Sequence, residues 1–224
     1  MPELKFEIIS AEVRPYAAFP TIVFKLQISN EIENEEVYAA ALKCQIMIEA
    51  IKRPYDAETK KRLYELFGEP HRWGETLKSL VWMIVNIPVP RFTGKTVVEV
   101  SVPCSEDQGL AAGKYFYGVR DEKVPLAFLF SGTLFFKGAE DQLQITQVPW
   151  EKEASFKMPA ILWQQMMAEY FPDCRWLRIR KEIYDKLVMY KAATSHPTLE
   201  NCLETVLEDA LKNVNVTEKL MHEE

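Results

Sequence analysis

A short segment near residue 178 interleaves basic and aromatic side chains, an arrangement that could bind phosphate or single-stranded nucleic acid. Its members are Arg175, Trp176, Arg178, Arg180, Lys181 and Tyr184. Acidic Glu182 and Asp185 lie in the same segment, and the chain carries a net charge of −6 with a sequence pI of about 5.3. Because an acidic protein repels a phosphate backbone, we expect no nucleic-acid partner. The segment is better interpreted as a salt-bridged joint between two helices.

The residues that could support catalysis are few. The three histidines, His71, His196 and His222, stand apart from any nucleophile with an orienting acid. Ser131, in the segment FSGT, lacks the G-x-S-x-G elbow that exposes a catalytic serine. No glycine-rich loop is present to hold a dinucleotide or a triphosphate. The sequence therefore shows no catalytic motif, and we expect neither an enzymatic activity nor a cofactor. For the paired carboxylates of glycoside hydrolysis the sequence is silent, because nothing selects two of its many acidic residues.

The best candidate for a metal site is the cluster of Glu69, His71 and Glu75. Pro70 and Trp73 interrupt it, and a turn followed by a solvated helix start explains the same residues. The cysteines, Cys44, Cys104, Cys174 and Cys202, are far apart and form no CxxC pair. This spacing predicts buried thiols in a reducing compartment rather than a zinc ribbon or a disulfide framework. We expect no bound metal.

An apolar stripe near the C-terminus could bind a partner. It contains Leu199, Leu203, Val206, Leu207 and Leu211 at the spacing of one helix face. Such a stripe is more often part of a core, so two interpretations remain: burial within the fold, or contact with another protein or a second copy. The arginines Arg175, Arg178 and Arg180 are the polar residues that could accompany it.

The elements that position these residues indicate an α+β fold. Period-two alternation, clearest from Tyr38 to Ile48, predicts an antiparallel sheet or sandwich of about seven to nine strands. Asp56 should cap an inserted helix, and Pro159 should begin the first of two or three C-terminal helices packed on one face. Of these, the second is expected to point Ile183, Tyr184, Leu187 and Val188 inward.

The same patterns predict a hairpin in which Lys114–Val119 pairs with Val124–Phe136. We expect one domain over residues 1–212 and a frayed tail over 213–224. The chain starts without a secretion signal, and its longest apolar runs are far shorter than the roughly 18 residues that span a bilayer. These features predict a cytoplasmic protein with no membrane partner.

Several blocks resemble an uncharacterised bacterial family of about this length, known as a domain of unknown function. They read LFGEPHRWGETL, VPCSEDQGLAAGKYF, VPLAFLFSGTLFF, QVPWEKEASFKMP and MMAEYFPDCRWLRIRKEIYDKL. Members are often encoded near uptake nickel-iron hydrogenases, which implies an accessory role. A weaker similarity is to the export chaperone SecB: Phe6–Val13, Ile22–Ser29 and Val37–Glu49 are similar to its opening strands, and Pro159–Tyr190 to its closing helices.

Together these points favour a non-enzymatic accessory factor that binds another protein, as a chaperone or a scaffold. The first alternative is an enzyme or small-molecule binder with a pocket between sheet and helices, near Trp150, Trp163 and Trp176. The second alternative is a permanent structural subunit of a larger complex.

Overall fold

The computed structural model describes residues 2–32, 35–104, 110–120, 123–138, 142–172 and 179–214. The chain divides into two compact units, Met1–Cys174 and Arg175–Glu224, and each is described by itself. Within the described ranges there are nine strands, paired antiparallel, and seven α-helices, so the predicted α+β class is confirmed. One domain over residues 1–212 stays a prediction.

The smaller sheet of the first unit has three antiparallel strands in the order β1-β2-β6. These are β1 (Leu4–Val13), β2 (Thr21–Asn30) and β6 (Lys95–Pro103). Alternation places Phe6, Phe24 and Val100 on the buried face and mostly polar side chains, such as Lys25 and Glu99, on the other. The expected period-two strands are therefore present, with one face toward the core.

The larger sheet has the order β4-β3-β7-β8, with β5 also on β3 and β9 also on β7. Its strands are β3 (Glu36–Ile48), β4 (Leu80–Val89), β5 (Phe92–Thr93), β7 (Lys123–Lys137), β8 (Leu143–Gln147) and β9 (Glu153–Pro159). The fifteen-residue β7 pairs along one side with β3 and along the other with β8 and then β9. β7 thus pairs directly with β3, β8 and β9, while β4 and β5 pair with β3.

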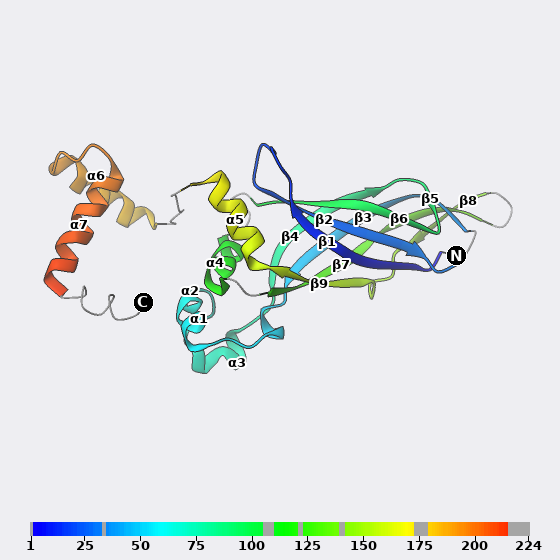
Figure 1. Cartoon of the computed structure of the whole chain (residues 1–224), viewed down its shortest axis with the longest axis horizontal. Helices are drawn as coiled ribbons and strands as arrows, with labels where there is room; N and C mark the ends of the chain where they lie inside the picture. Colours follow the sequence, from blue (N-terminus) through cyan, green and yellow to red (C-terminus); the bar gives the residue numbers. More distant parts are fainter. Residues whose placement is uncertain are drawn as a thin grey trace. The chain divides into compact units, whose positions relative to one another are not determined.

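The two sheets lie face to face (Figure 1). Aromatic side chains pack between them. Phe24 on β2 is fully buried and makes edge contacts with Trp82, Phe128 and Phe156 of the larger sheet, at ring centroid distances of 6.1, 5.0 and 6.0 Å. Phe6 on β1 stacks on Phe130 at 4.3 Å. Edge and offset contacts of this kind add to the stabilisation from burial alone.

Helices cover one end of this sandwich (Figure 1). They are α1 (Ala57–Arg62), α2 (Tyr64–Phe67), α3 (Trp73–Thr76), α4 (Leu110–Val119) and α5 (Ala160–Tyr170), with 3₁₀ turns at Ala50–Lys52 and Pro70–Arg72. Phe116 on α4 joins them to the sheet, since its ring lies 5.0 Å from Trp82 and 5.3 Å from Trp163 on α5. The helical end and the sandwich therefore share one core.

Asp56 caps the inserted helix as predicted: its carboxylate accepts a hydrogen bond from the Thr59 backbone N–H at 2.6 Å. The insertion is three short helices rather than one, because the chain breaks at Leu63 and again at Gly68, whose φ is 69°. Pro159 immediately precedes α5, also as predicted.

The predicted strand at Lys114–Val119 is wrong, because these residues belong to helix α4. Ala112, Tyr115, Phe116 and Val119 are all buried, at the i, i+3, i+4, i+7 spacing of one helix face. Six residues starting at Lys114 are too few to show that period, and a short, mostly apolar run fits a strand as well as a helix. The hairpin partner, Val124–Phe136, is correctly predicted and lies within β7.

Gly132 in β7 has a φ of 144°, and a Cβ there would lie 2.1 Å from the Ala41 carbonyl oxygen of β3. Gly132→Ala should destabilise the protein by about 3 kcal/mol or more, because backbone atoms of the central strand pair must move. Urea unfolding followed by circular dichroism measures this. Gly74→Ala is the matched control, since a Cβ at Gly74 meets nothing within 4 Å. Equal stability of the two variants would contradict the prediction.

Candidate interaction surface

The described residues contain no group of three His, Cys, Asp or Glu side chains that could hold a metal ion. In the predicted cluster, His71 Nδ1 lies 3.1 Å from Glu69 Oε2, and the imidazole is mostly exposed. Glu75 does not complete a ligand set with them. The pair is therefore an exposed contact on the 3₁₀ turn that precedes α3.

Two buried thiols are held in the protonated form. Burial raises the pKa of Cys44 to about 12 and the pKa of Cys104 to about 12. Since the thiolate is the nucleophile and the metal ligand, neither cysteine is activated at neutral pH. Both are free and buried, in line with their interpretation as core thiols.

Two tyrosines, the half-buried Tyr55 and the buried Tyr115, link the insertion to α4. The Tyr55 hydroxyl donates to the Ala50 carbonyl at 2.6 Å and lies 2.7 Å from the Tyr115 hydroxyl. Burial raises the pKa of both phenols, so both are neutral. The Arg53 guanidinium lies over the Tyr55 ring at 4.9 Å. These contacts satisfy buried polar atoms and position the insertion.

The tryptophans expected to line a pocket are in different surroundings. Trp163 is buried, stacked on Phe116 and in edge contact with Tyr117 at 4.7 Å. Trp150 is 88% exposed, and Trp176 lies outside the described residues. A hollow lined by residues that include Leu4, Leu134 and Val148 has room for about one water molecule. Trp163 is thus packed among aromatic rings, and this hollow is too small for a metabolite-sized ligand.

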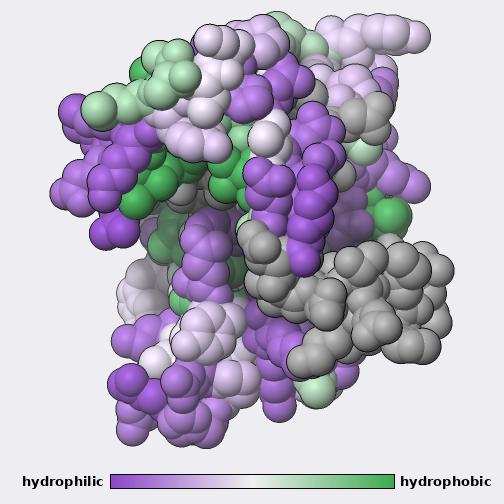
Figure 2. Space-filling model, turned by 90° about the vertical axis from the view of Figure 1, so that its left-hand side faces the viewer, coloured by the Kyte–Doolittle hydropathy of each residue, from purple (hydrophilic) through white to green (hydrophobic). Residues whose placement is uncertain are grey.

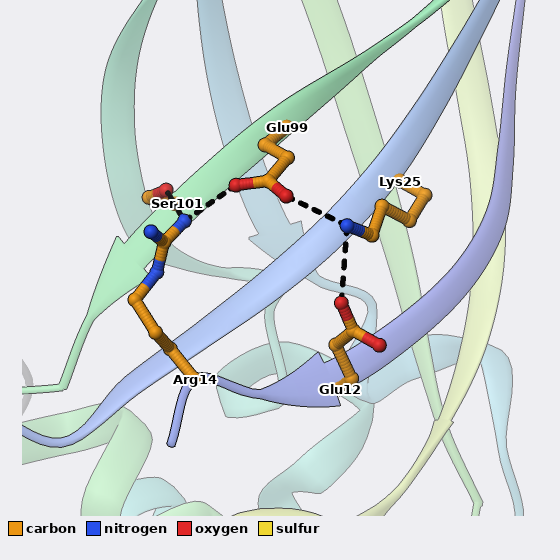
Figure 3. A network of polar contacts seen from close by, with 5 residues as sticks. All are labelled: Glu12, Arg14, Lys25, Glu99 and Ser101. Atoms are coloured by element: carbon orange, nitrogen blue, oxygen red, sulfur yellow. Dashed lines mark hydrogen bonds and ion pairs between the residues drawn. The ribbon is translucent and has the colours of Figure 1, made fainter. Parts of the chain in front are cut away.

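Charged side chains form a network on the outer face of the smaller sheet (Figure 3). Lys25 Nζ lies 2.7 Å from Glu99 Oε1 and 3.1 Å from Glu12 Oε1, while Arg14 Nη2 donates to Glu99 Oε2 at 2.6 Å and to Ser101 Oγ at 3.1 Å. Lys25 and Glu99 are direct partners in the β2–β6 register. The network neutralises its own charges, which suits strand register better than ligand binding.

The described part of the second unit contains two helices, α6 (Lys181–Ala193) and α7 (Leu199–Val214). Pro197 precedes Thr198, whose Oγ1 accepts from the Asn201 backbone N–H at 3.1 Å and so caps α7. The connection bends at Ser195, whose φ is 57°. Within this unit a short connection, residues 194–198, joins the end of α6 to the start of α7 (Figure 1).

The predicted apolar stripe lies on α7, but its two halves differ in burial. Near the connection, Cys202 is fully buried and Leu199 and Leu203 are half-buried. Further along, Val206, Leu207 and Leu211 are exposed by 39%, 59% and 44%. The second half of the stripe is therefore a surface, as the partner-binding interpretation requires.

Helix α6 also carries exposed apolar residues, several of which are predicted from their spacing to point inward. Leu187 is half-buried, but Ile183, Tyr184 and Val188 are exposed, and so are Met189 and Tyr190. Their helical spacing was visible in the sequence, but a stripe does not reveal whether another segment covers it. On the face that Figure 2 shows, hydrophobic residues reach the surface among hydrophilic ones.

We call the exposed apolar residues of α6 and α7 the hairpin surface. It comprises Ile183, Tyr184, Val188, Met189, Tyr190, Val206, Leu207 and Leu211. Arg180 is exposed and immediately precedes α6, whereas Arg175 and Arg178 lie outside the described residues. Among the described residues, no helix is long and apolar enough to cross a membrane.

Comparison with known proteins identifies a family for this chain but no activity. Residues 1–215 match a family of unknown function, DUF6084, and no curated protein matches the chain. Among solved structures, the CARDB domain of a Pyrococcus furiosus protein in complex with di-metal ions is 8% identical, over 70% of this chain and 92% of that one, with a TM-score of 0.28.

A putative late embryogenesis abundant protein is 10% identical, over 71% of this chain and 73% of that one, with a TM-score of 0.28. A Kluyveromyces marxianus β-glucosidase is 13% identical, over 70% of this chain and 15% of that one, with a TM-score of 0.23. Likenesses this weak carry no argument about the function of the chain.

Hydrogen bonds from Lys25 and Arg14 hold the pKa of the Glu99 carboxyl below its usual range. Its stabilising contribution is therefore present above the ordinary glutamate pKa of about 4.3 and is lost as the pH falls through the lowered value. We expect Glu99→Gln to lower the melting temperature at neutral pH, and the difference from wild type to shrink in acid. Glu75→Gln, which removes an exposed glutamate on α3, should show no such convergence. If the plots of melting temperature against pH stay parallel for wild type and Glu99→Gln, this assignment is contradicted.

Proposed function

The chain belongs to this family of unknown function, DUF6084, and we propose that it is a non-enzymatic accessory protein that binds another polypeptide through its C-terminal helices. The hairpin surface carries the proposal. Eight large apolar side chains of the described part of these helices are exposed, five on α6 and three on α7. Exposed apolar side chains that gather in one part of a protein are typical of an interaction site.

The energetics of the second unit support a partner. Isolated helices shorter than about 12 to 15 residues are marginal in water; α6, with 13 residues, lies in this range, and α7, with 16, is only slightly longer. Of the described residues in this unit, Cys202 alone is buried. A partner that covered the hairpin surface would supply the apolar burial that this pair of helices lacks.

The possible accessory roles differ in how long the partner stays bound. A chaperone releases its client, a scaffold holds its partner for the life of a complex, and a permanent structural subunit is the limit of the second case. The resemblance found in the sequence makes a subunit of a nickel-iron hydrogenase the first partner to test, in the cytoplasm. The alternative of a small-molecule binder or an enzyme gains no support from the packed surroundings of Trp163.

Leu207→Glu tests the hairpin surface. Leu207 is 59% exposed, and leucine and glutamate have similar helix propensities, so the change should leave thermal stability almost unaltered. It should lower the yield of any co-purifying polypeptide at least about tenfold, because a charge is buried at an apolar contact. The measurement is affinity purification at native expression level, with the complex mass determined.

Leu143→Glu is the matched control, because Leu143 in β8 has the same residue type and the same 59% exposure. It should leave the complex intact. A wild-type chain that elutes alone as a monomer, or equal loss of the complex in both variants, would contradict the proposed function.

A further inference from the structure

The two helices of the second unit carry opposite charge. Helix α6 has three lysines and two acidic residues, a net charge of +1. Helix α7 has four acidic residues and one lysine, a net charge of −3. Each therefore complements the other, and each would repel a copy of itself.

These charges border the apolar stripes. On α7, Glu200, Glu204 and Glu208 repeat every four residues and so follow one side of the stripe that contains Leu207 and Leu211. On α6, Lys181 and Lys186 lie on the two sides of the stripe that contains Ile183 and Tyr184. An apolar seam with charged borders is the arrangement by which paired helices select a partner and an orientation.

Within one chain, the opposite charges of the described parts of α6 and α7 do not pair with each other. The ion pairs seen in these helices are local: Lys181 Nζ to Asp185 Oδ2 at 2.5 Å, and Lys212 Nζ to Asp209 Oδ1 at 3.5 Å. Across the described part of this unit, no ion pair joins α6 to α7. Exposed apolar side chains lie near the start of α6, at Ile183 and Tyr184, and in the second half of α7, at Leu207 and Leu211.

We infer that the polypeptide bound by the hairpin surface is a second copy of this chain, with α6 of each copy lying against α7 of the other. This inference rests on the proposed function and names its partner. A two-fold axis makes both contacts identical, so one surface with a basic and an acidic half is self-complementary. Lysines of one copy then border the apolar contact opposite glutamates of the other.

Charge exchange between the helices tests this arrangement. Glu204→Lys with Glu208→Lys changes α7 from −3 to +1, because each substitution adds two charges, and Lys181→Glu with Lys186→Glu changes α6 from +1 to −3. The first double variant has two basic helices and the second has two acidic ones. Glu200 and Lys191 are left unchanged because they favour the dipoles of their own helix ends.

The measurement is the mass of the purified full-length chain over a concentration series, by analytical ultracentrifugation. We expect wild type to form a dimer and each double variant alone to dimerise at least about tenfold more weakly. An equimolar mixture should dimerise again, because each contact then pairs a basic helix with an acidic one. A heavy-nitrogen label on one variant identifies the mixed dimer by native mass spectrometry.

A wild-type chain that is monomeric at every concentration overturns the inference. So does a mixture that stays as weak as the separate variants, because the charges then act within one chain. If the purified chain is monomeric but Leu207→Glu loses a co-purifying protein of different mass, the proposed function stands and this inference fails. If the chain is monomeric and nothing co-purifies, both fail.

Discussion

The first unit depends on the burial of Phe24 between the two sheets. One ring on β2 contacts side chains from three strands of the larger sheet, so the sheets cannot slide past each other without separating these aromatic edges. Trp82 extends the same cluster to Phe116 on α4, and Phe116 to Trp163 on α5. A continuous aromatic core thus joins the smaller sheet, the larger sheet and the helices at one end.

The second unit is built differently. Local signals, rather than a shared core, set the starts and ends of its helices. These are the Thr198 cap of α7 and, in each helix, a glutamate in the first turn and a lysine in the last turn. Side chains that would be buried in the first unit are exposed here. This contrast in burial is the reason why the proposed binding surface is placed on the second unit.

Much of this could be read from the sequence, and the failures have a physical cause. Period two found the strands, Asp56 and Pro159 marked helix starts, and the stripe from Leu199 to Leu211 identified half of the hairpin surface. Helix α4 was missed because a six-residue apolar run fits either period. The α6 half was misjudged because Ile183 and Tyr184 were assumed to have a neighbour that covers them.

The sequence by itself determined what depends on adjacent residues: the strand alternation, the caps, the breaks at proline and glycine, and the charge of each helix. Only the tertiary structure decided what depends on residues far apart. The approach of Gly132 to Ala41, the meeting of Phe24 with three strands, and the exposure of Leu207 in a stripe whose Cys202 is buried are of this kind. The reason is that burial is a relation between distant segments, and a hydrophobic period records only that a residue can be buried.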